Sequence, residues 1–349
     1  MNDKLFFELK LKIQQAIMFG LDVSKFIEQL LVIENELNNS FKADKISDYY
    51  YKGQILNNPD SNLSVSMIVK NESANIRNTL ESIKLIADEI IIVDTGSEDD
   101  TIDICKEYTD KIYNMDWRDD FSYARNYSLD KCNGNWVLYI DADEVLSQRS
   151  IELLSNNLKN IDDEIGLLIC KVINYGMDNV GEKIEYVGQY PRIFRNLGFP
   201  LVHFFGRIHE QIGPSLLNYN FQMRNTDIEI IHNGYLIPNE EMQKKVQRNL
   251  QILANHIQED SSNAYTWYQL GNTFYQMKEY KQSIEVLENA LKCNNLSALL
   301  QSNTCLALSN AYLKTKNVSK ATDYARQSLK INPKNKVAEI LLAHLLNKN

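Results

Sequence analysis

The first part of the chain has hydrophobic residues at helical spacing. Between residues 4 and about 40, leucine, isoleucine, phenylalanine and valine recur every three or four positions, which is the period of an amphipathic helix. Gly20 interrupts this pattern, and Ser24 follows it as a candidate N-cap for a second helix. We therefore expect an N-terminal helical segment and linker over residues 1–60, with the helices packed on the main domain or on another subunit.

The pattern changes near residue 63, where short apolar runs begin to alternate with amphipathic stretches. The runs are rich in β-branched and aromatic residues, as buried strands are, and stretches of helical period separate the early ones. Strands that alternate with helices predict a parallel sheet with helices on both faces. We expect this domain to cover residues 61–238, with strands at 64–69, 89–94, 111–115, 136–140 and 166–175.

The C-terminal part, residues 239–349, has a helical pattern throughout and contains a repeat. Trp267, Leu270, Gly271 and Phe274 fit the tetratricopeptide signature, and a second copy follows about one repeat later. Small residues in this signature let paired helices approach closely. Such repeats bind peptides or subunits on a concave face. A helical bundle that only supports the preceding domain remains an alternative.

Polar residues follow three of the predicted strands. Asn71 and Glu72 come after the first, Asp94 ends the second, and Asp141 and Asp143 come after the fourth. Ligands of parallel sheets bind beyond the carboxyl ends of the strands. Two aspartates separated by one residue can direct oxygen ligands at Mg²⁺, which completes its coordination with phosphates and water. An isolated Asp-Ala-Asp is also typical of an acidic turn, but three converging strand ends favour a nucleotide site.

The chain contains neither GxGxxG nor GxxxxGK[ST], so carboxylates, a metal and an arginine would have to hold a nucleotide. Arg125 lies in the predicted helix before the acidic strand, although a surface salt bridge is the ordinary role of such a residue. Arg192 and Arg195 flank an apolar pair, as in a strand with one basic face. His232 is a candidate metal ligand through its neutral imidazole, although a histidine in such a strand is more often a core residue.

Composition narrows the class of protein. The 349 residues are 44% hydrophobic and 24% charged, as in ordinary globular proteins. The formal charge of −9 argues against nucleic acid as the main partner. The five cysteines have no CxxC spacing, which indicates free thiols. No apolar run approaches a membrane span and no signal peptide is evident, so we expect a cytoplasmic protein without a transmembrane segment.

An ordered set of motifs resembles glycosyltransferase family 2. Between residues 63 and 236 the chain contains IVKNES, IIIVDTGSEDDT, DFSYARN, WVLYIDADE, PRIFRN, GRIHEQ and IHNGY. With the tetratricopeptide C-terminus, this set is similar to bacterial peptide S-glycosyltransferases that modify cysteines of glycosylated bacteriocins. The motifs also occur in family 2 enzymes that build lipopolysaccharide core or capsule. The resemblance implies an α/β fold, with a Rossmann-like GT-A domain for nucleotide-sugar transfer, an all-α C-terminal domain and a short N-terminal helical segment.

The resemblance also implies a donor site at the strand ends. Asp94 corresponds to an aspartate that binds the base or ribose, and Asn71 and Glu72 would line the nucleoside. Lys70 stands where many relatives have a tyrosine that stacks on uracil, and Arg125 would meet the nucleobase or diphosphate. The residues implied to bind the nucleotide-sugar are Val69, Lys70, Asn71, Glu72, Asp94, Arg125, Asp141, Ala142, Arg192 and Arg195.

The same comparison implies metal and catalytic roles. Asp143 corresponds to the principal ligand of the DxD motif for Mg²⁺ or Mn²⁺, and Asp141 would reach the ribose, a metal-bound water or the metal. His232 matches the late histidine that completes the metal site in many GT-A enzymes. Glu210, which forms an HE pair with His209, lies where the family keeps the carboxylate that activates the acceptor.

We therefore expect a metal-dependent, inverting transferase that moves a hexose from a UDP-sugar to a peptide side chain, namely a cysteine, serine or threonine of a bacteriocin precursor. One alternative is a saccharide acceptor in cell-surface polysaccharide synthesis. Another is a tetratricopeptide scaffold with a degenerate nucleotide-binding domain. The tetratricopeptide domain would hold the acceptor or another subunit, and surplus helical surface at both ends of the chain suggests a homodimer.

Overall fold

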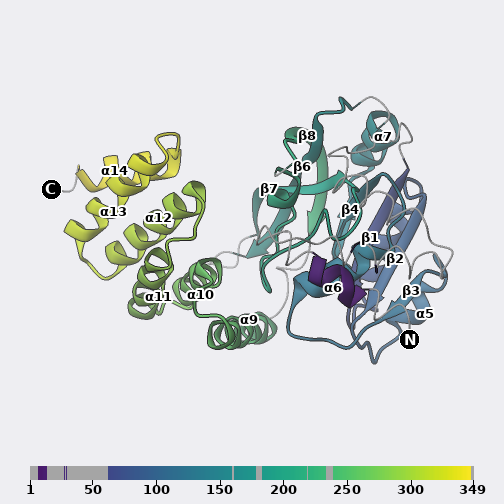
Figure 1. Cartoon of the computed structure of the whole chain (residues 1–349), viewed down its shortest axis with the longest axis horizontal. Helices are drawn as coiled ribbons and strands as arrows, with labels where there is room; N and C mark the ends of the chain where they lie inside the picture. Colours follow the sequence, from purple (N-terminus) through teal and green to yellow (C-terminus); the bar gives the residue numbers. More distant parts are fainter. Residues whose placement is uncertain are drawn as a thin grey trace. The chain divides into compact units, whose positions relative to one another are not determined.

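The protein forms two compact units, which are described separately (Figure 1). The computed structural model describes residues 7–13, 27, 29, 62–158, 161–177, 183–217, 219–232 and 239–346. The first unit, called the sheet unit, comprises Met1–Phe205 and Glu210–Ile237. The second, called the helical unit, comprises Gly206–His209 and Pro238–Asn349. The short segment Gly206–His209 thus groups with the helices, although both of its flanks belong to the sheet unit.

One half of the sheet is parallel, as the sequence pattern predicts. Its strand order is β3-β2-β1-β4, and each neighbouring pair is parallel. Val69 is paired with Asp94, and Ser66 is paired with Tyr139. The carboxyl ends of these strands therefore lie at one edge of the sheet. The bounds are β1 Leu63–Val69, β2 Glu89–Asp94, β3 Ile112–Asn114 and β4 Trp136–Tyr139.

The other half of the sheet is mixed, whereas the alternation of early strands and helices predicts only parallel pairing. Strand β7 is antiparallel to both β4 and β6, β6 is parallel to β8, and β5 is antiparallel to β8. Consecutive strands β6 and β7 form a hairpin, a connection that only antiparallel strands can make with a short loop. The bounds are β5 Glu144–Leu146, β6 Ile165–Met177, β7 Lys183–Arg195 and β8 Gln222–His232.

Apolar side chains cover both faces of the sheet, because successive residues of a strand point to opposite faces. Ile91 and Val137 belong to one buried cluster, whereas Ile92 and Leu138 belong to the other. Helix α6 begins after Asp120, whose carboxylate accepts a hydrogen bond from the Tyr123 amide and caps the helix. The helices of this unit are α4 Ile76–Ile83, α5 Thr101–Cys105, α6 Phe121–Lys131, α7 Gln148–Asn157 and α8 Gly213–Leu217.

Residues 7–13 are helical and lie inside the core of the sheet unit, the first of the two packing sites that we expected. Phe7 stacks on Phe199, with 5.2 Å between ring centroids. Lys10 is fully buried, and its Nζ donates to Asp130 Oδ1 at 2.9 Å. The predicted break near Gly20 and the predicted linker lie outside the described residues.

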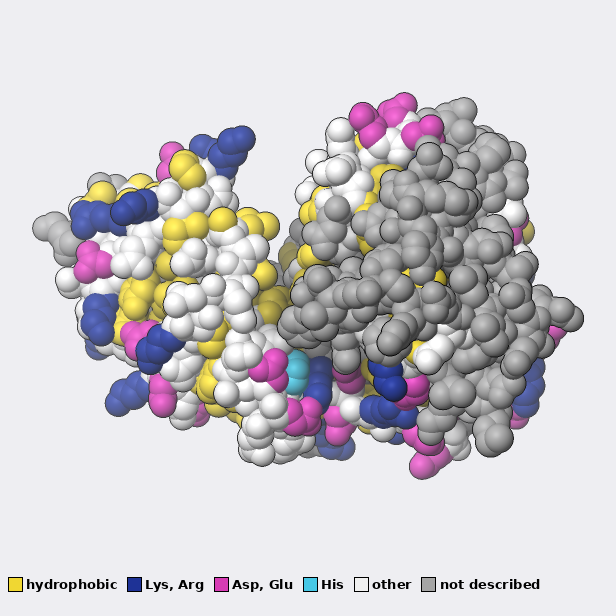
Figure 2. All heavy atoms as spheres, viewed as in Figure 1, with side chains coloured by type: hydrophobic (Ala, Val, Ile, Leu, Met, Phe, Trp, Pro, Cys, Tyr) yellow, Lys and Arg dark blue, Asp and Glu magenta, His cyan; other side chains and the backbone are white. Residues whose placement is uncertain are grey.

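The helical unit consists of antiparallel helices, as the repeat pattern predicts. A Cβ on Gly271 would lie 2.4 Å from Leu287 Cγ, so only glycine allows this approach of α10 and α11. Figure 2 shows hydrophobic side chains on the surface of this unit, where Val337 and Ile340 of α14 are exposed. The helices are α9 Asn239–Glu259, α10 Ala264–Gln276, α11 Tyr280–Lys292, α12 Ala298–Lys314, α13 Val318–Ile331 and α14 Lys336–Leu346. None of the helices in the described part of the chain has the length and apolar content needed to cross a membrane.

Replacing Lys10 tests the importance of the N-terminal helix. Lys10→Met removes the ammonium that pairs with Asp130 in the core, where Lys131 Nζ is 3.5 Å from the other carboxylate oxygen, and should lower the free energy of unfolding by about 3–5 kcal/mol. In a Trp267→Phe background, the two remaining tryptophans, Trp117 and Trp136, report urea unfolding of the sheet unit alone.

The control is the double variant Lys10→Met/Asp130→Leu, which removes both charges and should recover most of that loss. A single variant as stable as the parent protein would show that the N-terminal helix adds little to the sheet unit.

Candidate active site

The ends of β1 and β2 are joined by hydrogen bonds between the loops that follow them. Asn71 has a left-handed backbone, with φ 55°, which asparagine tolerates better than most residues. Its amide donates to Ser97 Oγ at 3.0 Å, and its Oδ1 accepts from the Glu98 amide at 2.8 Å. The Glu72 amide donates to Thr101 Oγ1 at 2.7 Å. Asn71 and Glu72 therefore form a fixed wall at this edge of the sheet.

Asp94 shapes the turn that follows it. Its carboxylate accepts from the amides of Gly96 and Ser97 at 3.1 Å and from the Ser97 hydroxyl at 2.6 Å. Val69, its partner on β1, is buried, whereas the neighbouring Lys70 is exposed. Five of the residues expected to bind the nucleotide-sugar, Val69, Lys70, Asn71, Glu72 and Asp94, thus lie at this edge, but the structure shows Asp94 engaged by its own loop.

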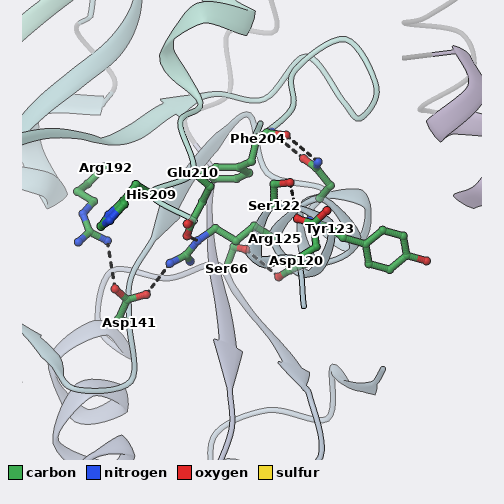
Figure 3. A network of polar contacts seen from close by, with 12 residues as sticks. Ser66, Asp120, Ser122, Tyr123, Arg125, Asp141, Arg192, Phe204, His209 and Glu210 are labelled. Carbon is green, nitrogen blue, oxygen red and sulfur yellow. Dashed lines mark hydrogen bonds and ion pairs between the residues drawn. The ribbon is translucent and has the colours of Figure 1, made fainter. Parts of the chain in front are cut away.

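A row of alternating charges lies at the carboxyl end of β4, where Arg192 of β7 comes close to it (Figure 3). Asp141 follows β4, and its Oδ1 accepts from Arg125 Nη2 at 2.7 Å. On the other side of Arg125, the Nε donates to Glu210 Oε1. Arg192 Nη1 lies 3.9 Å from Asp141 Oδ2, and Arg192 Nη2 donates to Glu144 Oε1 at 2.6 Å. The order of charges is therefore glutamate, arginine, aspartate, arginine, glutamate.

The two arginines of this row are buried and have nitrogen atoms without a hydrogen-bond partner. Arg125 is 5% exposed and Arg192 is 8% exposed. Both guanidinium groups lie over the Tyr139 ring, at 4.9 and 4.8 Å from its centroid. Among the described residues, Arg125 Nη1 and Arg192 Nε and Nη1 are the buried side-chain nitrogens that lack a partner. A buried donor without an acceptor is unfavourable, so these groups favour an anionic ligand.

Within this row, the pKa of Asp141 is lowered and the pKa of Glu144 is raised. Burial alone would raise the pKa of Asp141, but the charges of Arg125 and Arg192 outweigh it and hold that pKa below its usual value. Burial raises the pKa of Glu144 to about 7, against the opposing charge of Arg192. Asp141 therefore keeps its negative charge at neutral pH, whereas Glu144 is close to its titration point.

Asp143 and His232 form a second centre beside this row. Strand β5 pairs Glu144 with His232, so the preceding Asp143 comes next to the imidazole. The distance between His232 Nε2 and Asp143 Oδ2 is 3.3 Å. On the other side, His232 Nδ1 is 2.9 Å from Asn174 Oδ1. Asn174 Nδ2 donates to the Val172 carbonyl at 3.1 Å, which assigns the amide oxygen to the imidazole.

This arrangement fits a cation. Because Asn174 Oδ1 can only accept, His232 Nδ1 carries the proton, and the lone pair of Nε2 points toward Asp143. A lone pair and a carboxylate oxygen at this distance repel each other unless a proton or a metal lies between them. Burial would lower the pKa of His232, but the hydrogen bond and charge of Asp143 outweigh it and raise that pKa above its usual value.

The structure brings together two of the three expected metal ligands. Asp141, the third, pairs with Arg125 and Arg192 instead. Within the described residues, no group of three or more His, Cys, Asp or Glu side chains could hold a metal ion. A carboxylate and an imidazole still suffice for Mg²⁺ or Mn²⁺ when substrate phosphates and water fill the remaining positions.

Glu210 lies on a loop that α6 holds in place. Asn126, next to Arg125, donates to the Phe204 carbonyl at 2.9 Å and accepts from the Phe204 amide at 2.7 Å. Phe205 and Gln211 then form an antiparallel bridge. His209 belongs to the segment Gly206–His209 and has φ 54°, and its carbonyl accepts from the Tyr265 hydroxyl at 2.6 Å.

Some expected residues lie elsewhere, and some residues of the site were not expected. Arg195 is not part of the charge row: its guanidinium lies 4.8 Å from the centroid of a Trp136 ring, and its Nε donates to the carbonyl of Ile165, the first residue of β6. Ala142 is buried, and its carbonyl accepts from a threonine hydroxyl. Sequence reasoning gave no role to Glu144 or Asn174. Asn174 had one usable signal, an amide within an apolar strand.

The pH dependence of cation binding tests this centre. A proton and a divalent cation compete for His232 Nε2, so Mn²⁺ affinity should fall about tenfold per pH unit below the raised pKa of His232 and level off above it. Free Mn²⁺ can be measured by electron paramagnetic resonance during a titration. His232→Gln should weaken binding and remove the pH dependence, whereas the control His344→Gln, on α14, should change neither. Binding by the parent protein that does not vary with pH would contradict the assignment.

Comparisons with known proteins give relatives for most of the chain. The chain is 27% identical over 234 residues to the SPbeta prophage-derived glycosyltransferase SunS of Bacillus subtilis, which corresponds to 66% of this chain and 53% of SunS. It is 31% identical over 236 residues to a TPR repeat-containing protein of Synechococcus elongatus, covering 66% and 56%. The chain thus spans about half the length of these curated relatives.

One solved structure with partial likeness is Staphylococcus aureus TarS 1–349 in complex with UDP-GlcNAc, with 15% sequence identity, a TM-score of 0.44, and coverage of 77% of this chain and 90% of TarS 1–349. The model of glycosyl transferase family 2 matches residues 64–211, and the tetratricopeptide model matches residues 264–295 and 302–335. The expected α/β domain and the helical domain after it are confirmed. The chain therefore carries a family 2 glycosyltransferase domain followed by tetratricopeptide repeats.

Proposed function

We propose that the protein transfers a hexose from a UDP-sugar to a side chain of a peptide, with the aid of Mg²⁺ or Mn²⁺. The observation that carries this proposal is the group of unpartnered nitrogens on Arg125 and Arg192, next to the Asp143–His232 pair. Buried donors favour an anion, and the carboxylate with its imidazole favours a cation. A diphosphate with a bound divalent cation satisfies both at once, and a nucleotide-sugar donor carries one.

The donor would extend from the charge row to the ends of β1 and β2. Asn71 and Glu72 form the wall there, and Asp94 holds the adjoining turn. The nucleoside would lie against this wall, with Val69 and Lys70 beside it, as the family resemblance implies. In this proposal Asp94 acts partly by shaping the loop, and Asp141 meets the ribose or a water on the metal.

The chemistry is an in-line displacement at the anomeric carbon. A metal held by Asp143 and His232 would stabilise the charge that develops on the diphosphate. The bond from the anomeric carbon to the diphosphate oxygen breaks, and its electron pair remains on that oxygen. The acceptor sulfur or oxygen forms the new bond, and Glu210 takes the acceptor proton. A general base of this kind contributes about 10²–10⁴-fold, and a thiol acceptor needs it less. A single displacement inverts the anomeric configuration.

The helical unit offers a place for a peptide acceptor. It contains a cavity of about 240 Å³ between α10 and α12. Amide side chains can pair with both the N–H and the C=O groups of a peptide main chain, and the tyrosines provide apolar contact with polar tips. None of the described residues that line the cavity is charged, so these residues would not select acidic or basic peptides. The lining residues are Tyr268, Asn272, Tyr275, Asn303, Leu306, Ala307 and Asn310.

The metal assignment predicts that Asp143→Asn abolishes the release of UDP from UDP-glucose. Without a carboxylate opposite His232 the cation is lost, and the rate of Mg²⁺-dependent hydrolysis in the absence of acceptor should fall about 10²-fold or more. Asp227→Asn is the matched control, because that aspartate pairs with Lys171 at an exposed position. An Asp143→Asn protein with normal hydrolysis would disprove the metal assignment.

The acceptor assignment predicts a mass gain on a peptide. A peptide that contains cysteine and serine, incubated with the protein, Mg²⁺ and a panel of UDP-sugars, should gain one hexose, and prior alkylation of its cysteine should prevent the gain if sulfur is the acceptor. Asn272→Ala/Asn303→Ala should raise the KM for the peptide but leave UDP-glucose hydrolysis unchanged, and Asn249→Ala, on α9 and outside the residues given for the cavity lining, serves as a control. UDP release without any peptide product would instead favour a saccharide acceptor.

A further inference from the structure

Arg125 divides its donors between two carboxylates and keeps one donor unused. Its Nη2 donates to Asp141 Oδ1 at 2.7 Å, its Nε donates to Glu210 Oε1, and its Nη1 is buried without a partner. The guanidinium lies between the rings of Tyr139 and Phe204, at 4.9 and 5.9 Å from their centroids. These rings confine the guanidinium, so an anion that pairs with Nη1 would share one cation with the two carboxylates.

We propose that Arg125 pairs with Glu210 in the free protein and with the diphosphate when the donor is bound. Donor binding then releases Glu210, the proposed general base. This inference rests on the proposed function. Before the donor binds, Arg125 holds Glu210 in an ion pair, in which Oε1 is already occupied by an N–H donor. When the diphosphate arrives, Arg125 gives hydrogen bonds to its oxygens, and Glu210 Oε1 becomes available for the proton of the acceptor. Donor binding therefore precedes activation of the acceptor.

Glu210 is the carboxylate of the row that can release Arg125 at the lowest cost. Asp141 is fixed through its backbone, because its amide donates to Glu144 Oε2 at 3.0 Å. Glu144 pairs with Arg192 and not with Arg125. Asp141 is more exposed than Glu210, at 37% against 12% of the side chain, but Arg192 also holds it, with Nη1 3.9 Å from Asp141 Oδ2. Glu210 lies on a loop outside the strands. The ion pair of Arg125 with Glu210 is therefore the one that a diphosphate displaces.

If Glu210 and the diphosphate compete for Arg125, the direction of the change in nucleotide affinity shows it when Glu210 is replaced. If Glu210 and the diphosphate compete for Arg125, removing the charge of Glu210 must strengthen nucleotide binding, because linkage between two ligands of one group is reciprocal. If Glu210 only orients Arg125 for the nucleotide, the same change must weaken binding. We expect Glu210→Gln to bind UDP with Mg²⁺ about 5–10-fold more tightly than the parent protein, which is about 1–1.4 kcal/mol.

The test is a double-mutant cycle measured by isothermal titration calorimetry with UDP and Mg²⁺. Its four proteins are the parent, Glu210→Gln, Arg125→Gln and the double variant, and Glu107→Gln is a control because Glu107 also pairs with an arginine, on the surface. In the Arg125→Gln background, Glu210→Gln should leave the affinity unchanged. If Arg125→Gln does not fold, Arg125→Lys replaces it, because an ammonium cannot keep the planar fork, and the gain should shrink there.

The outcomes separate the two proposals. A parent protein that does not bind UDP with Mg²⁺ overturns the proposed function. A parent protein that binds UDP, together with a Glu210→Gln variant that binds it equally or more weakly, overturns only the sharing of Arg125. An equal gain in both backgrounds also overturns the sharing, since the effect would then come from the general electrostatic field. Tighter binding that depends on Arg125 supports it.

Discussion

Buried charge must be neutralised, and this constraint organises the edge of the sheet where the strands of the parallel half end. Two guanidinium groups, those of Arg125 and Arg192, are almost removed from water, and a buried charge of this kind is unfavourable unless it is paired. Three carboxylates satisfy them, and each comes from a different place in the chain: Asp141 after β4, Glu144 on β5 and Glu210 on a loop. The pairing therefore fixes how these segments meet, and what remains unpaired becomes the place for a ligand.

The two halves of the sheet contribute differently to this edge. In the parallel half, the ends of β1 and β2 provide a wall made mainly of backbone groups and short polar side chains around Asn71 and Asp94. In the mixed half, pairing between β5 and β8 sets the position of a single side chain, because the residue before Glu144 must lie next to His232. The wall formed by the loops after β1 and β2 suits a nucleoside, whereas the Asp143–His232 pair, whose two side chains are held at fixed positions, suits a cation.

The sequence predicted the parallel half well and the mixed half poorly, for physical reasons. A carboxylate after an apolar run must come to the surface, so Asp94, Asp141 and Asp143 marked the strand ends. Strand β5, however, has only three residues, and in the sequence they look like part of an acidic turn. Its pairing with β8 is a long-range contact, which no local sequence pattern predicts. Arg195 looked equivalent to Arg192, but a spacing of three places two strand residues on opposite faces, and Arg195 instead lies over a Trp136 ring.

The N-terminal helix has a consequence for the boundaries of any shortened protein. The family match begins at residue 64, yet Phe7 fills the space between Phe199, Tyr123 and Tyr127. A fragment cut to the family match would therefore expose these aromatic rings and remove Lys10, the buried partner of Asp130. Such a fragment would associate through that surface, so the domain that folds is larger than the domain that sequence families delimit.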